Sequence, residues 1–441
     1  MGSVIDPAFS TNSILSERLR YLVEAGDGEA APQLSADVEF EVFAMPGANR
    51  KAKAPVDVVV AVNEINDQHG TGPLVKRVFG DRENLFSIRS QNDWGDHDFG
   101  DFSVCIPQHD RPRPECFRRA LTALGNRQVD QILCVPFHSD ELITSIAIRD
   151  GYEADLCMWL MDDQNIVVDV VPDDLMFEFL EKSSLRLFTH GELRDAYERK
   201  YGLKSYVLPA IVPHRYVATD LVPPPEDMTK GALIGSFWDQ NWFARTCDAL
   251  AGSGQRIDWY GNDKSPWLRF PPEEMERAGI SALGLYPEER LVRQLRKYPY
   301  VVVPVGTFDS KETNTGVARL SLPGRILFAV ASAHTPMLLI GSGETCGARF
   351  VKNFDLGEVV PYSSAAVAGA IERLTEPGNQ MRIRKNAAAI AERLSDKEIG
   401  VWLRESIRLG EPADRRFEDL FAYETEAALK PLEIEPYRRT R

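Results

Sequence analysis

Apolar residues fall into short continuous runs that alternate with helix-like stretches. The runs begin with VDVVVA at residues 56–61 and continue with QILCV at 131–135 and DLCMWL at 155–160. Continuous β-branched and apolar runs are typical of strands in parallel sheets, which are buried on both faces. Stretches with apolar residues three and four positions apart lie between them, as in amphipathic helices. This alternation predicts an α/β protein built on doubly wound parallel sheets.

A proline-rich segment divides this pattern into two halves. The segment PHRYVATDLVPPPEDMTKG, residues 213–231, has no clear period and is typical of a linker. The chain has 441 residues, more than one hydrophobic core normally serves. We therefore expect two Rossmann-like domains, at residues 1–225 and 226–412, that face each other across a cleft. Residues 413–441 are expected to form a helix and tail that return to the N-terminal domain.

Charge and composition exclude several classes of protein. With 51 Lys and Arg against 66 Asp and Glu, the formal net charge is −15, which argues against nonspecific nucleic-acid binding. The six cysteines form no CxxC pair or zinc-finger spacing. No apolar run is long enough to span a bilayer, and no segment has the order of a signal peptide. We expect a cytoplasmic protein, and both peripheral membrane contact and the oligomeric state stay open.

In open parallel sheets, ligands bind beyond the carboxyl ends of the strands, so residues that follow predicted strands are the candidates for chemistry. The first is HGTG, with His69, Gly70 and Gly72 between a strand and a helix. Such glycines let a ligand approach the helix N-terminus, although a plain tight turn fits equally well. Because the loop is not GxGxxG, a dinucleotide-dependent oxidoreductase is disfavoured.

Two further candidates follow strands of the first half. His138 could act as a base or bind a sugar hydroxyl, or it could simply precede a helix capped by Ser139 or Asp140. Asp162 and Asp163 end a strongly apolar run. Adjacent residues of a strand point in different directions, so one carboxylate could be a general base while the other caps a turn. Paired Asp can also bind Mg²⁺, but no third acidic ligand is spaced to join them, and we predict no metal site.

Three candidates lie in the second half. Gly235 and Ser236 form a turn after a strand that could offer N–H groups to a phosphate. Gly324 and Arg325 begin a helix, where a guanidinium and the helix N-terminus could bind one diphosphate together, unless the Arg forms a structural ion pair. Glu344 lies in a glycine-rich loop after PMLLI, as a ligand for sugar hydroxyls or as a helix cap.

These segments resemble glycosyltransferases of the GT-B fold, especially bacterial enzymes that build surface polysaccharides. The resemblance covers most of the chain, at residues 55–410. HGTG is similar to the first loop of that family, and MWLMDD stands where many members carry a His-Asp pair. The segments SLRLFTHGELRDAYERKYG and PGRILFAVASAHTP are similar to the end of the acceptor domain and to a donor-binding helix.

The resemblance implies a metal-independent hexosyltransferase without a cofactor, whose substrate is a nucleotide diphospho-sugar. Positive charge and a helix dipole would stabilise the leaving diphosphate in place of a metal. The implied donor residues are Gly235, Ser236, Gly324 and Arg325 for the diphosphate, Leu285 and Tyr286 for the base, and Glu344 for the sugar. The implied acceptor, a saccharide or lipid-linked saccharide, would bind His69, Gly70 and Gly72, with Asp163 or Asp162 and His138 nearest the reacting carbon.

One departure from the family keeps two alternatives open. Many retaining members carry two glutamates around the donor-binding helix, where this chain has Ser321 and Ala329. A non-catalytic sugar-nucleotide-binding or interaction protein is therefore one alternative. A sugar-nucleotide epimerase, which shares the two-domain plan, is the other.

Overall fold

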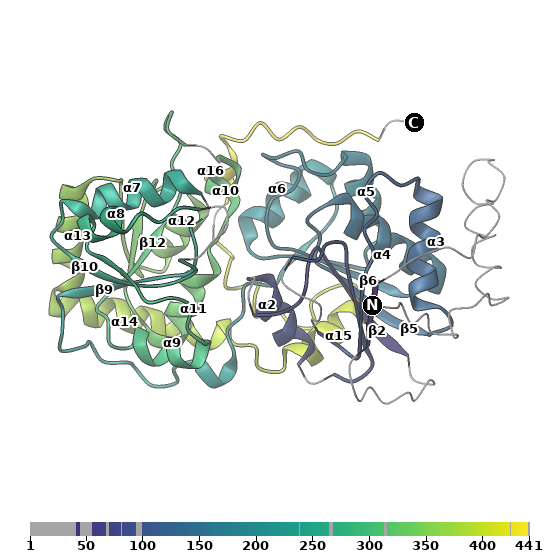
Figure 1. Cartoon of the computed structure of the whole chain (residues 1–441), viewed down its shortest axis with the longest axis horizontal. Coiled ribbons are helices and arrows are strands. Elements are labelled where there is room, and N and C mark those ends of the chain that lie inside the picture. Colours follow the sequence, from purple (N-terminus) through teal and green to yellow (C-terminus); the bar gives the residue numbers. More distant parts are fainter. Residues whose placement is uncertain are drawn as a thin grey trace.

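The computed structural model (Figure 1) shows two α/β units side by side, joined by the linker and by the C-terminal part of the chain. It describes residues 41–44, 55–67, 70–80, 82–93, 99–237, 239–263, 268–312, 315–423 and 425–439. The predicted α/β class with two parallel sheets is confirmed.

The first sheet is parallel apart from one edge strand. Its strand order is β1-β4-β3-β2-β5-β6-β7-β8, and β1 pairs with β4 in the antiparallel sense. The strands are β1 (Glu41–Ala44), β2 (Val56–Ala61), β3 (Leu85–Arg89), β4 (Phe102–Cys105), β5 (Val129–Cys134), β6 (Asp155–Leu160), β7 (Leu185–Phe188) and β8 (Tyr206–Val207). The helices are α2 (Thr71–Phe79), α3 (Arg113–Leu124), α4 (Ser139–Tyr152), α5 (Asp173–Lys182) and α6 (Gly191–Tyr201).

The second sheet is parallel throughout, in the order β11-β10-β9-β12-β13-β14. Its strands are β9 (Lys230–Ile234), β10 (Arg256–Tyr260), β11 (Ile280–Ala282), β12 (Val301–Pro304), β13 (Met337–Ile340) and β14 (Gly357–Val360). The helices are α7 (Gln240–Ala251), α8 (Pro272–Arg277), α9 (Glu288–Leu295), α10 (Thr315–Leu320), α11 (Gly324–Ala333), α12 (Cys346–Asn353), α13 (Ser364–Thr375) and α14 (Pro377–Ala391).

Both faces of each sheet are buried, as the continuous apolar runs predict. Side chains alternate along a strand, so Val58 and Val60 enter one core of the first domain while Val59 enters another. The core that contains Val59 continues through the interface to Ile234 and Val303 of the second sheet. Full burial of each such side chain contributes about 1.5–3 kcal/mol. The two domains therefore share part of their hydrophobic core.

The chain crosses between the domains twice, and the two crossings are hydrogen-bonded to each other. Val212, on the first crossing, forms a parallel bridge with Ser395, on the second. The Val212 N–H donates to the Leu394 carbonyl at 2.7 Å, and the Asp396 N–H donates to the Val212 carbonyl at 2.9 Å. The linker then lies along the second domain, where the Val222 N–H donates to Nδ1 of the buried His334 at 3.2 Å.

After the second crossing, the chain packs on the first domain. Helix α15 (Ile399–Leu409) contacts α2 and β6. Within residues 413–441, where a helix and tail are expected, the one helix among the described residues is α16 (Glu426–Leu429), which lies beside α6 and is four residues long. The return to the first domain thus uses α15 as well as the last helix, and the exact domain limits stay a prediction.

Candidate functional site

Residues that follow β7 adjoin residues that follow β12 and β13 across the domain interface. The Nε2 atom of His190, directly before α6, lies 2.8 Å from the carbonyl oxygen of Leu320, at the end of α10. Its Nδ1 atom lies 3.3 Å from Sγ of Cys346, the first residue of α12. Residues that follow the strands of both sheets therefore meet at one interface, where the sequence analysis expects the site.

Arg325 lies at the start of α11, against the loop that follows β9. Its Nη1 donates to the carbonyl oxygens of Ile234 and Ser236, each at 3.0 Å. Gly235 between them has φ of 80°, a left-handed conformation that favours glycine. No carboxylate of the described residues pairs with Arg325, and burial lowers the pKa of its guanidinium to about 10. The expectation of Gly235, Ser236 and Arg325 as neighbours is met, and an anion here would relieve the cost of burying the charge.

The start of α12 packs beside the start of α11. A Cβ on Gly347 would come within 3.2 Å of Pro323 Cδ. Thr345 caps α12 by accepting a hydrogen bond from the Ala348 N–H at 3.3 Å, so Glu344 is not the cap. The Glu344 side chain is exposed. Gly324 faces the first domain, where its Cβ would meet Ala210 at 3.1 Å.

Two further arginines follow β9 and β12 in the second domain. Arg245 is paired with Asp309 at 2.8 Å and lies over the ring of Tyr362, with 4.6 Å to the ring centroid. Arg319, on α10, stacks on Phe308 at 4.1 Å and has no ion pair among the described side chains. Arg319 was not among the candidates predicted from the sequence, where its place on the segment that follows β12 is the one signal for it.

The loop predicted to hold a nucleotide base follows β11. Tyr286 packs edge-on against Tyr260 with 4.9 Å between ring centroids, and the Arg290 guanidinium lies 3.8 Å from the Tyr286 centroid. Leu285 is 64% exposed. The loop offers an aromatic ring and an open apolar side chain at the sheet edge, and the role of Leu285 and Tyr286 stays a prediction.

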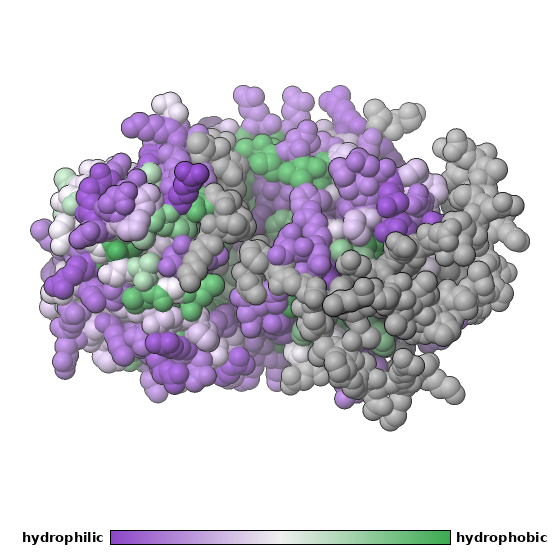
Figure 2. Space-filling model, viewed as in Figure 1, coloured by the Kyte–Doolittle hydropathy of each residue, from purple (hydrophilic) through white to green (hydrophobic). Residues whose placement is uncertain are grey.

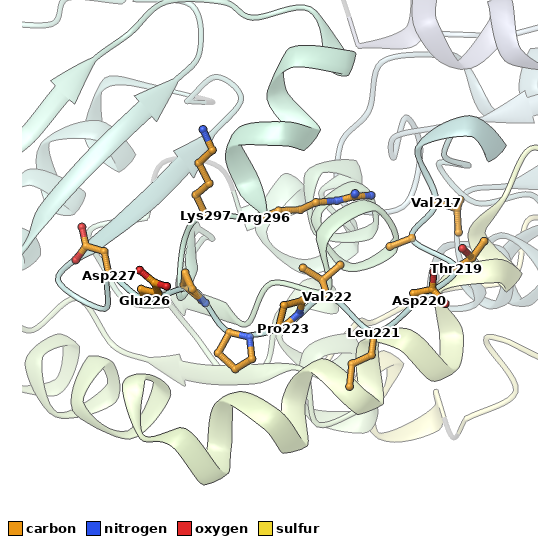
Figure 3. Close-up of a pocket in the computed structure, with 13 residues that line it drawn as sticks. Val217, Thr219, Asp220, Leu221, Val222, Pro223, Glu226, Asp227, Arg296 and Lys297 are labelled. Atoms are coloured by element: carbon orange, nitrogen blue, oxygen red, sulfur yellow. The ribbon is translucent and has the colours of Figure 1, made fainter.

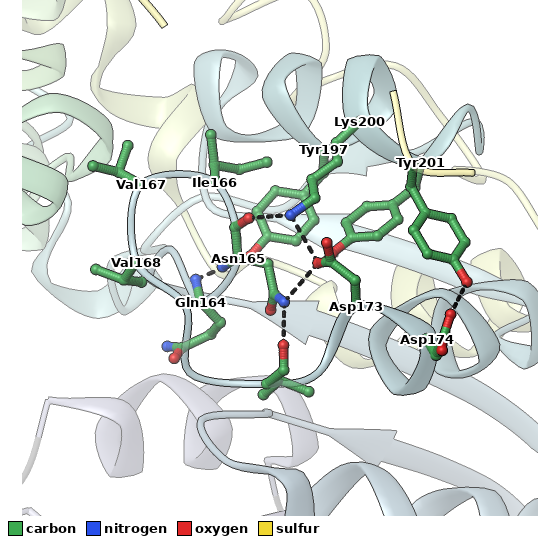
Figure 4. A network of polar contacts seen from close by, with 12 residues as sticks. Gln164, Asn165, Ile166, Val167, Val168, Asp173, Asp174, Tyr197, Lys200 and Tyr201 are labelled. Atoms are coloured by element: carbon green, nitrogen blue, oxygen red, sulfur yellow. Dashed lines mark hydrogen bonds and ion pairs between the residues drawn. The ribbon is translucent and has the colours of Figure 1, made fainter. Parts of the chain in front are cut away.

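Asp163 holds the loop that follows β6 (Figure 4 shows this region). Its Oδ1 accepts hydrogen bonds from the Ile166 N–H at 2.9 Å and from the Tyr197 hydroxyl at 3.3 Å, and its Oδ2 accepts from the Val167 N–H at 2.8 Å. The N–H groups of Asn165 and Val168 also donate to it. These contacts give Asp163 a structural role in holding the loop, and its part as the catalytic base stays a prediction.

Asp162, the other aspartate of the pair, takes no part in these contacts. It is half-buried; the Gln164 side chain donates to its backbone carbonyl oxygen at 3.5 Å, and no hydrogen bond from a described residue reaches its carboxylate oxygens. Burial, and then the adjacent charge of Asp163, raise the pKa of Asp162 to about 6. A carboxylate that titrates near neutrality is suited to accept a proton from a hydroxyl.

The other first-domain candidates have structural explanations or lie outside the described residues. His138 is exposed and is the N-cap of α4, in place of Ser139 or Asp140; its backbone N–H donates to Oε2 of Glu141, the third residue of the helix, at 2.6 Å in a capping box. A Cβ on Gly72 would overlap the Asn66 carbonyl oxygen at 1.9 Å, whereas Gly70 faces open space. His69 lies outside the described residues.

Two cavities adjoin the linker, away from these candidates. One of about 680 Å³ lies between residues 217–227 and the pair Arg296 and Lys297 (Figure 3). The other, of about 380 Å³, shares Arg296 and reaches Arg215 and Tyr216. Among the described residues, no three His, Cys, Asp or Glu side chains gather as metal ligands would. No described helix is long and apolar enough to cross a membrane.

Solved structures share this arrangement. The Anabaena protein HepE (Alr3699), in a structure with UDP and glucose, gives a TM-score of 0.55 at 14% identity, over 80% of this chain and 100% of its own. The chain has the GT-B fold. A second HepE structure, with UDP, also gives 0.55 at 14% identity, over 80% of this chain and 99% of its own. MurG from Acinetobacter baumannii gives 0.47 at 10% identity, over 80% of this chain and 100% of its own.

No protein-family model and no curated protein matches the sequence. The likeness therefore lies in the fold, at 14% sequence identity to HepE.

A pair of substitutions tests whether Gly72 is held by packing. Gly72→Ala should lower the free energy of unfolding by about 1–3 kcal/mol, because the new methyl group overlaps the Asn66 backbone. Gly70→Ala, two residues away in open space, should change it by less than about 0.5 kcal/mol. Urea unfolding of both variants measures the difference. Equal effects at the two positions would contradict the packing role.

Proposed function

We propose that this protein is a glycosyltransferase that moves a sugar from a nucleotide diphospho-sugar to an acceptor. The observation that carries the proposal is the guanidinium of Arg325, which lies at the start of α11 without a carboxylate partner among the described residues. A diphosphate there would receive hydrogen bonds from the guanidinium and the favourable end of the helix dipole. The GT-B fold and the UDP in both HepE structures support the proposal.

The same groups would assist departure of the diphosphate. As the bond between the sugar and the diphosphate breaks, negative charge gathers on the diphosphate, where Arg325 and the N-terminus of α11 stabilise it. The proposed mechanism therefore uses no metal ion and no cofactor. Glu344, exposed in the adjacent loop, would accept hydrogen bonds from sugar hydroxyls.

Asp162 is the proposed base for the acceptor. Its carboxylate would accept the proton of the acceptor hydroxyl while that oxygen attacks the anomeric carbon. Asp163 contributes indirectly, because its hydrogen bonds fix the loop that begins beside Asp162. This assignment divides the adjacent pair into one reacting group and one structural group.

Exposed valines in the loop after Asp162 suit an acceptor that has an apolar group. Val167 is 36% exposed and Val170 is 43% exposed, and in Figure 4 Val167 and Val168 point away from the polar network that fixes the loop. Hydrophobic surface also gathers in the upper middle of Figure 2, between the two domains and below a rim of hydrophilic side chains. An alkyl or aryl group next to the reacting hydroxyl would bury these valines. A lipid-linked saccharide of the kind used in polysaccharide synthesis has this chemistry.

Binding of UDP tests the donor site. UDP at 100 times its dissociation constant should stabilise the wild-type protein by about 2.7 kcal/mol, with or without EDTA. Arg325→Ala should weaken UDP binding at least about tenfold and leave uridine binding unchanged, because a charge-assisted hydrogen bond contributes about 1.5–3 kcal/mol. Isothermal titration with both ligands measures this.

Arg415→Ala, at an exposed arginine of the C-terminal segment, is the matched control and should bind UDP normally. Equal loss of UDP and uridine affinity in Arg325→Ala would contradict the phosphate role. If no nucleoside diphosphate stabilises the wild-type protein, the donor proposal itself fails.

The pKa of Asp162 predicts a pH dependence with a defined sign. Because the folded-state pKa, about 6, is above the ordinary value of 3.8, deprotonation destabilises the fold as the pH rises from about 4 to 6. Asp162→Asn should therefore raise the melting temperature at pH 8 but not at pH 4, and should lower turnover about 10²–10⁴-fold. Asp163→Asn should lower the melting temperature at both pH values. A lower melting temperature of Asp162→Asn at pH 8 would count against this assignment.

Matched glucosides test the apolar loop, with UDP-glucose as donor. The wild-type protein should prefer octyl over methyl glucoside as acceptor. Val167→Asp should lower kcat/KM for octyl glucoside about 10-fold or more, because one buried valine contact is lost. The kcat/KM for methyl glucoside should not change. Val401→Asp, at an exposed valine on α15, should leave both values unchanged. Equal losses for both acceptors in Val167→Asp would remove the apolar contact from the proposal.

A further inference from the structure

A buried ion pair links α6 of the first domain to α12 of the second. Arg349 Nε donates to Glu192 Oε1 at 2.7 Å, and Nη2 donates to Glu192 Oε2. The Glu192 side chain is fully buried, and the Arg349 side chain is 21% exposed. Planar, two-point pairing of this kind fixes the relative position of its partners in both distance and orientation.

The third nitrogen of the same guanidinium binds the donor loop. Arg349 Nη1 donates to the backbone carbonyl of Glu344. Glu344 lies between Ser342, whose N–H donates to the Gly306 carbonyl at 2.9 Å, and Thr345, the cap of α12. One guanidinium thus joins a carboxylate of the first domain to the loop of the second domain that carries the proposed sugar ligand.

The surroundings of the pair keep its charges in place. Burial lowers the pKa of Arg349, but the hydrogen bonds and charge of Glu192 outweigh burial and raise the pKa above its ordinary value. The neighbouring His190 accepts a hydrogen bond from the Leu193 N–H on Nδ1, so its Nε2 carries the proton that it donates to Leu320. Burial lowers the pKa of His190 and keeps it neutral. The adjacent histidine therefore brings no competing charge.

We propose that Glu192 and Arg349 are positioning residues for the donor sugar: Glu192 of the acceptor domain sets the position of Glu344 through the guanidinium of Arg349. This inference rests on the proposed function and deepens it. The diphosphate contact at Arg325 belongs to the second domain alone, whereas the sugar contact depends on the first domain. The donor sugar is therefore held in the reacting position only while the two domains are in contact.

The test distinguishes binding of the donor sugar from binding of the nucleotide. Glu192→Gln keeps the size of the side chain but removes the charge, and it should leave the UDP dissociation constant within about twofold of wild type. A displaced reacting group costs about 100-fold in rate, so kcat with UDP-glucose should fall by about that factor. Binding of UDP-glucose should also lose its advantage over UDP.

Two comparisons identify the path through Arg349. Arg349→Lys, which keeps the charge but cannot pair at two points, should produce the same split between UDP and UDP-glucose. Glu344→Gln should lose sugar-dependent binding, and the double variant Glu192→Gln/Glu344→Gln should lose little more, because both act on one loop. Additive losses in the double variant would overturn the inference.

A matched control uses another ion pair of the same helix. Arg194 of α6 pairs with Glu418 of the C-terminal segment and does not touch the donor loop. Glu418→Gln should leave both UDP and UDP-glucose binding unchanged. Melting temperatures of all variants show whether they fold. Equal loss of UDP and UDP-glucose binding in Glu192→Gln, or equal loss in Glu418→Gln, contradicts the positioning role. Failure of the wild-type protein to bind UDP contradicts the proposed function instead.

Discussion

Burial of both faces of each parallel sheet is the constraint on which the rest of the structure depends. Strands such as β2 and β12 carry buried valines on both sides, so the ligand-binding groups are expected in the loops at their carboxyl ends. The loops at the carboxyl ends of the two sheets meet at the interface, where one core cluster runs through both domains. Asp162, Arg325 and the Glu192–Arg349 pair are all consequences of that arrangement.

The class of fold was readable from the sequence because it rests on a repeated local signal. Continuous apolar runs such as residues 56–61 and 301–304 indicate buried strands. The proline-rich linker indicates where the first domain ends and the second begins. The C-terminal segment was harder. The helix expected within residues 413–441 is short, because of the described residues there only Glu426–Leu429 form one, beside α6. Tertiary contacts decided that conformation, and local propensity did not.

The sequence predicts which residues follow the strands, but it does not predict which of them contact one another. The sequence places Asp162 and Asp163 side by side after a strand. Only the structure shows that Asp163 is the one that accepts hydrogen bonds from the backbone N–H groups of residues 165–168. The sequence does not distinguish Arg325 from Arg245 as a phosphate ligand. Only the structure shows that Arg245 already forms an ion pair with Asp309. The Glu192–Arg349 contact joins residues 157 positions apart, and no local pattern contains it.

The double crossing at Val212 and Ser395 has a mechanical consequence. Two backbone segments bridged side by side are held in register, because hydrogen bonds at 2.7 and 2.9 Å resist sliding of one segment along the other. The Glu192–Arg349 pair joins the domains at a second place, so the two domains are tied both by backbone hydrogen bonds at the crossings and by a buried ion pair between α6 and α12.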